Sequence, residues 1–171
     1  MHVTDIIHEL EKIIHPGRYK REFTEEQLDQ FAVVGFFWER VLGGIWRDTE
    51  IRRSDGRLIR PPEQYLDGVY LSPDALDVED WVVEEFKATW ISSNLDIASD
   101  PRVFKWRSQT KAYCRALDTR RCRLRALFVC GHWRPPVPVV KLYEIEYSKN
   151  ELLENWLALL RLAKRKGWLT P

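Results

Sequence analysis

Two carboxylates and a lysine with the spacing of a catalytic site lie in the stretch from Leu71 to Trp90. Asp74 follows a proline, and Glu85 and Lys87 stand two positions apart in an apolar, β-branched segment. Because side chains alternate along a strand, Glu85 and Lys87 project from one face, where they are costly without partners. Two carboxylates and a backbone carbonyl are the hard oxygen ligands that Mg²⁺ or Mn²⁺ prefers. A lysine beside them could polarise an attacking water or steady a phosphate oxygen.

A third acidic residue with a candidate role precedes this stretch. Thr24 to Gln27 has the pattern of a capping box, which predicts a helix from there to the stop at Gly43-Gly44. Glu39 borders the apolar stripe of that helix, four residues after Gly35. From the residues alone, an ion pair with an arginine at the rim and a place at a metal site are equally good interpretations.

A polar pair on an apolar helix follows the stretch. Asp100-Pro101 is typical of a helix start, and Trp106, Gln109 and Tyr113 then fall on one helix face. A buried glutamine needs hydrogen-bond partners, and Tyr113 is its neighbour at a spacing of four. The alternative is a glutamine satisfied by backbone groups.

Together these patterns resemble a known family. Pro73-Asp74, ten intervening residues and then Glu85-Phe86-Lys87 resemble the PD-(D/E)XK nuclease motif, and the surrounding SPDALDVEDWVVEEFKAT is most similar to the RecB-like, phage lambda-type exonuclease branch. The segment QTKAYCRAL is similar to the QxxxY helix of RecB-like nucleases. Gly35 followed four residues later by Glu39 is similar to the helix that carries a metal-facing glutamate in lambda-type exonucleases.

The resemblance implies a metal-dependent deoxyribonuclease that hydrolyses DNA phosphodiesters, as an exonuclease in phage-type recombination, repair or DNA processing. It implies that Asp74, Glu85 and the Phe86 carbonyl bind Mg²⁺ or Mn²⁺. Glu39 would contribute to a second metal or orient its water, and Lys87 would position the nucleophilic water and help to deprotonate it.

The resemblance also implies substrate contacts. Gln109 and Tyr113 would shape the site and touch the DNA. A basic turn beside that helix, at residues 118–125, could grip the DNA backbone through Arg120 and Arg121, although an exposed turn before a strand is an equally good interpretation. The arginines among residues 45–63 could contact phosphates or simply be solvated.

Three alternatives remain at this point. A structure-specific endonuclease would use the same residues. A catalytically idle nucleic-acid-binding module would be expected to have lost a ligand, and all of the ligands are present. A soluble interaction domain with accidental motif matches predicts that Gln109 lies far from Asp74.

The elements that must position these residues form an α/β pattern. Helices are expected at 4–14 and 24–44, strands from Tyr65 to Trp90, a helix after Pro101, two more strands, and a last helix capped at Ser148. We expect a central mixed β-sheet flanked by helices, as in a restriction-endonuclease-like core. A length of 171 residues suits one domain, with an N-terminal helical part at 1–44 and a catalytic core at 45–171.

Composition limits the partners and the compartment. A net charge of +1 excludes a generic polycation. Binding of DNA would therefore need positively charged side chains that are clustered on the surface. Three single cysteines, at 114, 122 and 130, favour reduced thiols in a cytosol-like compartment, and are too few for a four-cysteine iron–sulfur cluster. The resemblance implies that this compartment is the cytosol of a bacterium or of a phage-infected host. The apolar run from Phe31 to Trp38 is too short to cross a membrane. The expected partner is DNA, with a separate recombination or replication protein or further copies of the chain as open alternatives.

Overall fold

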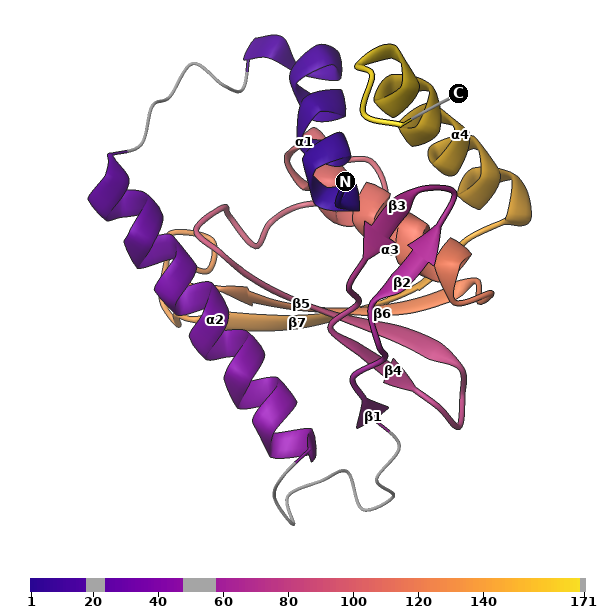
Figure 1. The fold of residues 1–171 in the computed structure, drawn as a ribbon. Coiled ribbons are helices and arrows are strands. Elements are labelled where there is room, and N and C mark those ends of the chain that lie inside the picture. Colours follow the sequence, from indigo (N-terminus) through magenta and orange to yellow (C-terminus); the bar gives the residue numbers. More distant parts are fainter. Residues whose placement is uncertain (18–23, 48–57, 170–171) are drawn as a thin grey trace.

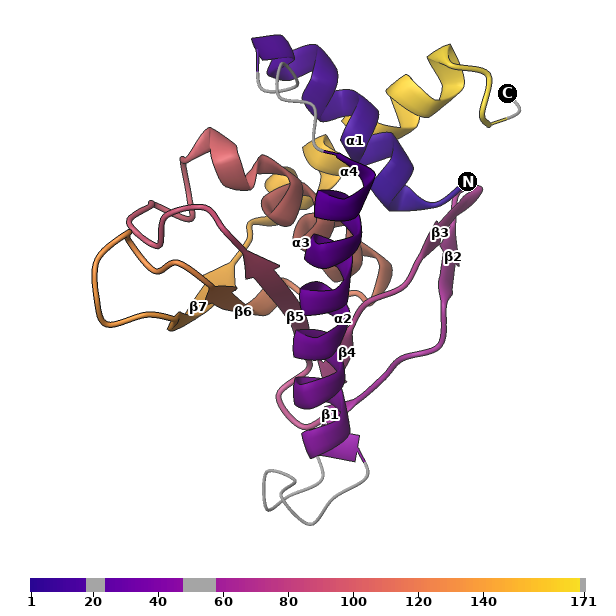
Figure 2. The ribbon, with the colours of Figure 1, turned by 90° about the vertical axis from the view of Figure 1, so that its left-hand side faces the viewer.

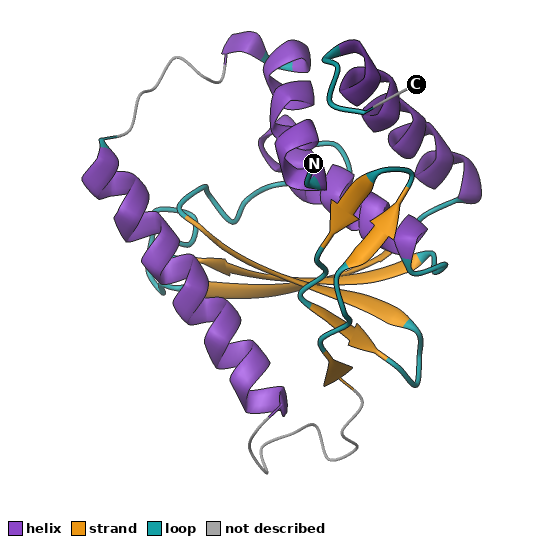
Figure 3. Ribbon diagram, in the orientation of Figure 1, coloured by secondary structure: helices purple, strands orange, loops and turns teal. Residues whose placement is uncertain are grey.

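The computed structural model describes residues 1–17, 24–47 and 58–169, with the side chains of residue 39 and of residues 41–47 excepted. It is an α/β fold, as the sequence predicts (Figures 1 and 3). The helices are α1 (Val3–Ile14), α2 (Glu25–Arg47), α3 (Phe104–Ala116) and α4 (Lys149–Arg165). The strands are β1 (Leu58–Ile59), β2 (Gln64–Leu66), β3 (Val69–Leu71), β4 (Ala75–Asp77), β5 (Val82–Thr89), β6 (Arg121–Phe128) and β7 (Val139–Glu146).

A mixed five-stranded sheet runs through the centre in the order β1-β4-β5-β6-β7. Within this sheet β5 and β6 pair in parallel, while the other neighbours are antiparallel. A parallel pair needs a long crossover, and the segment that contains α3 supplies it. The register sets Lys87 beside Ala126 and Thr89 beside Phe128. Strand β7 forms one edge of this sheet, opposite β1.

Three helices pack together over one face of the sheet, and α2 stands apart from them (Figures 1 and 2). The core joins Ile6 of α1, Tyr113 of α3 and Trp156 of α4 to Val83 and Cys122 of the sheet. Residues of β6 alternate between buried and more exposed positions, as expected for a strand with one covered face. Helix α2 packs instead against β5 and β1.

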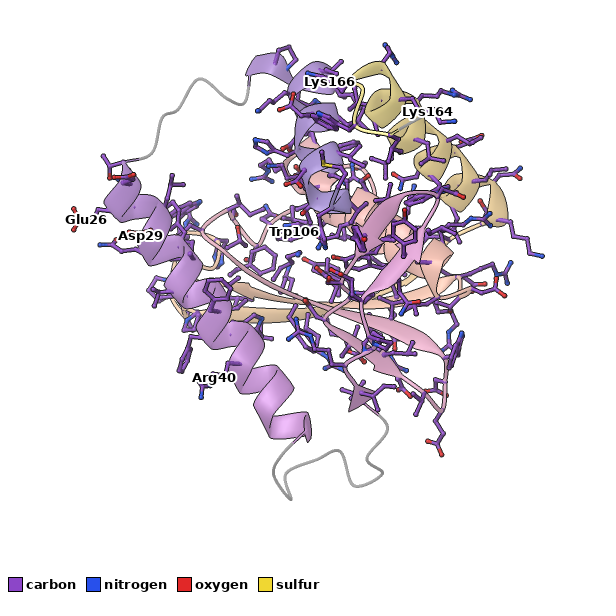
Figure 4. The ribbon with its side chains drawn as sticks, viewed as in Figure 1. Glu26, Asp29, Arg40, Trp106, Lys164 and Lys166 are labelled. Carbon is purple, nitrogen blue, oxygen red and sulfur yellow. The ribbon has the colours of Figure 1, made fainter. Side chains whose placement is uncertain are left out.

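Capping follows the sequence patterns. The Ser148 hydroxyl accepts from the backbone of Glu151, and the Glu151 carboxylate accepts from the Ser148 N–H at 2.9 Å, so α4 begins with a full capping box. Asp100 caps the short 3₁₀ helix Pro101–Val103 that leads into α3. Figure 4 places Lys164 and Lys166 at the far end of α4, where positive charge complements the helix dipole.

Two expectations about element boundaries were wrong. Helix α2 continues through Gly43-Gly44 to Arg47, because glycine permits a stop but does not impose one. Residues from Tyr65 to Leu71 do not enter the central sheet, since β2 and β3 form a separate two-stranded sheet. Asp67 and Gly68 join them with φ angles of 50° and 86°, which is the backbone of a tight hairpin turn.

None of the helices in the described part of the chain is long and apolar enough to cross a membrane.

Candidate active site

Strand pairing brings the first predicted carboxylate next to the second. In the β4–β5 pair Ala75 lies opposite Glu84, so Asp74 comes beside Glu85 one residue further along. The Asp74 Oδ2 atom accepts a hydrogen bond of 2.8 Å from the backbone N–H of Phe86. This bond holds the half-buried Asp74 side chain against β5, at the peptide that joins Glu85 to Phe86.

The second carboxylate is enclosed and paired with the predicted lysine. The Glu85 side chain is fully buried, whereas the Lys87 side chain keeps about a fifth of its surface in contact with solvent. The two form a short ion pair along the same face of β5. A charge at 0% exposure is tolerated only with partners, and the cation two residues away is one of them.

Helix α3 completes a chain of hydrogen bonds. The Lys87 ammonium donates to Gln109 Oε1 at 2.9 Å, and Gln109 Nε2 donates to the Tyr113 hydroxyl at 2.8 Å. Tyr113 belongs to α3, and its side chain is buried in the core. The Gln109 amide presents its oxygen to Lys87 and its nitrogen to Tyr113. The Lys87 ammonium is therefore held between the Gln109 amide oxygen and the Glu85 carboxylate.

The first turn of α3 is held by a contact near this cluster. Trp106, which Figure 4 labels on α3, has its ring centroid 6.3 Å from that of Phe128 at the end of β6. This contact fixes the start of α3 over the end of the parallel strand pair.

Six of the predicted site residues therefore lie in one place. We call this set the β5–α3 cluster, and its members are Asp74, Glu85, Phe86, Lys87, Gln109 and Tyr113. The alternative of an interaction domain with accidental motifs predicted Gln109 far from Asp74. Lys87, Glu85 and the β5 backbone instead link the two.

The seventh residue, Glu39, has a side chain outside the described ones. Its backbone belongs to α2, which packs against β5. Phe31 of α2 meets Trp90, just beyond the end of β5, with ring centroids 4.5 Å apart. The acidic and basic side chains Glu26, Asp29 and Arg40 of the same helix point away from the sheet (Figure 4). The role of Glu39 stays a prediction.

Arg120 and Arg121 are not brought to the cluster. They stand at the start of β6, whereas Lys87 pairs with Ala126 near its other end. Arg120 forms an ion pair of 2.9 Å with Glu146, and Arg121 donates to the Asp80 carbonyl at 3.3 Å. Both are exposed, and their contact with substrate stays a prediction.

A second charged cluster, which the sequence reading missed, occupies the opposite face of the sheet. Glu84 and Asp77 are fully buried there. Arg125 Nε donates to Glu84 at 2.6 Å, and Arg123 Nη1 donates to Asp77 at 2.9 Å. Burial works against the Arg123 charge, but its bonds to carboxylates outweigh burial and raise its pKa. These four charges neutralise one another and hold β4, β5 and β6 together. The signal was the arginines at alternate positions of residues 121–125.

The donor set of the β5–α3 cluster fits a hard divalent cation. Glu85 supplies a carboxylate from β5, and Asp74 supplies one from the position just before β4. Mg²⁺ is commonly held by one or two carboxylates together with water and substrate phosphate. Among the described residues no group of three or more His, Cys, Asp or Glu side chains is arranged to hold a metal. Within the β5–α3 cluster, Asp74 and Glu85 are the carboxylates that could hold such a cation.

Comparison with known proteins finds likeness in fold only. No protein-family model and no curated protein matches the sequence. Among solved structures, the protein SSO0001 is similar with a TM-score of 0.56 and 12% identity, over 95% of this chain and 75% of that one. A phage related exonuclease from Haemophilus somnus 129PT is similar with a TM-score of 0.52 and 11% identity, over 95% of this chain and 79% of that one.

Proposed function

We propose that this chain is a metal-dependent nuclease that hydrolyses DNA phosphodiesters, most simply as an exonuclease, with residues 1–171 forming one nuclease domain. The observation that carries the proposal is the β5–α3 cluster: a buried glutamate, a lysine on the same strand face and a carboxylate from the residue just before the paired strand β4. The fold shared with a protein named as a phage related exonuclease supports the same reaction class.

In this proposal the protein side chains bind and orient the reactants. Asp74, Glu85 and the Phe86 carbonyl would hold Mg²⁺ or Mn²⁺, and Glu39 would contribute from α2. A bound divalent cation supplies Lewis-acid stabilisation of charge on the phosphate and lowers the pKa of water. Lys87 would hold the attacking water or a phosphate oxygen, since its ammonium donates hydrogen bonds and its side chain is about one-fifth exposed.

The hydrolysis balances without a further reactant. Water attacks phosphorus, the bond from phosphorus to the 3′ oxygen breaks, and the proton lost by water ends on the leaving oxygen or in solvent. Gln109 and Tyr113 keep Lys87 in place during this step, because a fixed hydrogen-bonded ammonium needs little reorganisation as charge develops. An endonuclease would use the same residues and would differ in how the DNA reaches them.

The test is cleavage of end-labelled linear DNA and closed circular DNA in Mg²⁺, Mn²⁺ or EDTA. The wild type is compared with Lys87→Ala and with the matched control Lys111→Ala, whose lysine pairs with Glu151 on the side of α3 toward α4. Metal-dependent loss of linear DNA that spares circles and disappears only in Lys87→Ala supports the exonuclease. Cutting of circles assigns an endonuclease. Binding without cleavage in any metal indicates an idle module, and absence of binding refutes the proposal.

A further inference from the structure

An exposed tryptophan stands at the tip of the loop between β6 and β7, at residues 129–138. Trp133 is 65% exposed, and its backbone φ is 69°. The left-handed region costs a bulky residue about 1–2 kcal/mol, and such strain persists where the surrounding structure imposes it, commonly at functional sites. The loop therefore holds the Trp133 ring outward, in contact with solvent.

The base of the loop is bonded to the strand that carries Lys87. The Val129 N–H donates to the carbonyl of Thr89 at 2.9 Å, and Thr89 ends β5 two residues after Lys87. The connection that follows β5 is bonded to the loop as well, since the Ser93 N–H donates to the Gly131 carbonyl at 2.7 Å. The loop is thus attached to the β5–α3 cluster through main-chain bonds.

The loop is also tightly folded on itself. Gly131 has a φ of 53°, and a Cβ atom there would lie 3.0 Å from Val137 Cγ1 and 3.1 Å from Val139 Cγ2. The Trp133 N–H donates to the Cys130 carbonyl at 2.9 Å. Prolines at 135, 136 and 138 restrict the backbone further. A ring displayed on such a loop loses little freedom on binding, which favours affinity.

The loop lies at the end of the sheet nearest to Lys87. Lys87 pairs with Ala126, and the loop begins three residues later, about 10 Å along the strand at roughly 3.3 Å per residue. Figure 2 shows this orange loop on the same side as the connection that follows β5. Trp133 stands between His132 and Arg134, both exposed, and within the described residues no acidic side chain forms an ion pair with Arg134.

We propose that Trp133 stacks on an unpaired nucleobase of the strand bound at the β5–α3 cluster, with Arg134 at a neighbouring phosphate. This inference rests on the proposed nuclease function and names its substrate class: single-stranded DNA, or a duplex end with an overhang or frayed base. A base inside a duplex has both faces covered by its neighbours, whereas an unpaired base has a free π-face for an aromatic ring. An exposed ring beside a cation, here Arg134, is the combination that single-strand binding sites use.

The test measures binding of oligonucleotides that carry 2-aminopurine, a base whose fluorescence is quenched by stacking. Binding is measured in a Lys87→Ala background in EDTA, which prevents cleavage, with single-stranded, overhang and blunt duplex DNA. Trp133→Leu removes the aromatic ring, and Trp133→Phe keeps one. Trp81→Leu is the matched control, because Trp81 is also exposed with a positive φ but precedes β5 at the other end of the sheet.

Trp133→Leu is expected to weaken single-strand binding by about 5- to 150-fold, the equivalent of one stacked base, and to abolish the quenching. Trp133→Phe should retain most of both, and blunt duplex binding should change little in either. Equal effects of Trp133→Leu and Trp81→Leu on single-strand binding, or no effect of either, would overturn the stacking proposal. In that case, DNA cleavage by the wild type would still support the proposed nuclease function. A wild type that binds no DNA would overturn both. Thermal melting of each variant verifies that it is folded.

Discussion

Replacing Lys87 with methionine removes the cation that pairs with the fully buried Glu85. Breaking a buried ion pair at one partner costs about 3–5 kcal/mol, because the remaining charge loses its compensation. Lys87 is one-fifth exposed and Gln109 remains beside it, so we expect the lower end, about 3 kcal/mol. For a chain of this length that corresponds to a fall in Tm of roughly 6–12 °C.

The companion variants separate charge from packing. Glu85→Gln keeps the shape and removes the charge, so the double variant Glu85→Gln with Lys87→Met buries no unpaired carboxylate. We expect the double variant to regain about 2 kcal/mol relative to Lys87→Met alone, a strongly non-additive result. The control is the solvent-accessible pair of Lys12 and Glu9 on α1, where Lys12→Met should change stability far less than Lys87→Met does.

The assay is denaturation in urea, with the midpoint compared at constant m-value. Two results would refute the reasoning. One is an equal loss of stability in Lys87→Met and Lys12→Met, which would mean that burial does not amplify the Glu85 pair. The other is a double variant whose loss equals the sum of the single losses, which would mean that the two charges are not coupled.

Three further predictions concern neighbouring groups. Gln109→Leu removes the hydrogen-bond acceptor that holds Lys87. In the DNA cleavage assay this variant should have a kcat about 10- to 100-fold lower, with little change in KM. Full activity would exclude a positioning role for Gln109. Mn²⁺ at 100-fold over its Kd should stabilise the wild type by about 2.7 kcal/mol in thermal melts, and Asp74→Asn should lose that gain; an equal gain in both would exclude Asp74 as a ligand. The backbone N–H and hydroxyl of Ser148 lower the pKa of Glu151 below its usual 4.5. The stability that Glu151 adds relative to Glu151→Gln should therefore be fully present above pH 4.5, and should disappear as the pH falls through the lowered pKa of the folded state. Urea titrations of both proteins at a series of pH values measure this difference.

Much of the fold and of the cluster was predictable because the signals are local. Alternation along β5 set Glu85 and Lys87 on one face, and helical spacing set Gln109 next to Tyr113. The capping patterns marked the start of α4 and the entry to α3 for the same reason, since each depends on residues within one turn.

The remaining features depend on which strands become neighbours, and periodicity carries no such information. Arg120 and Arg121 are close in sequence to the cluster helix, yet the parallel register puts them at the opposite end of the sheet. Burial of Glu84 and Asp77 depends on the place of β6 beside β5, with Arg123 opposite Glu84. A cross-strand partner is a property of the topology and not of the segment.

The crossover through α3 has a consequence for how the molecule folds. The paired residues Val83 and Cys122 are distant in sequence, and α3 lies between them. Parallel pairing of this kind must lose the entropy of closing a long loop before it gains any contact, which places it among the slow steps of folding. Because α3 itself carries Gln109 and Tyr113, the contacts around Lys87 form as that loop closes. A partly folded chain in which β5 and β6 have not yet paired has the motif in its sequence but no assembled β5–α3 cluster.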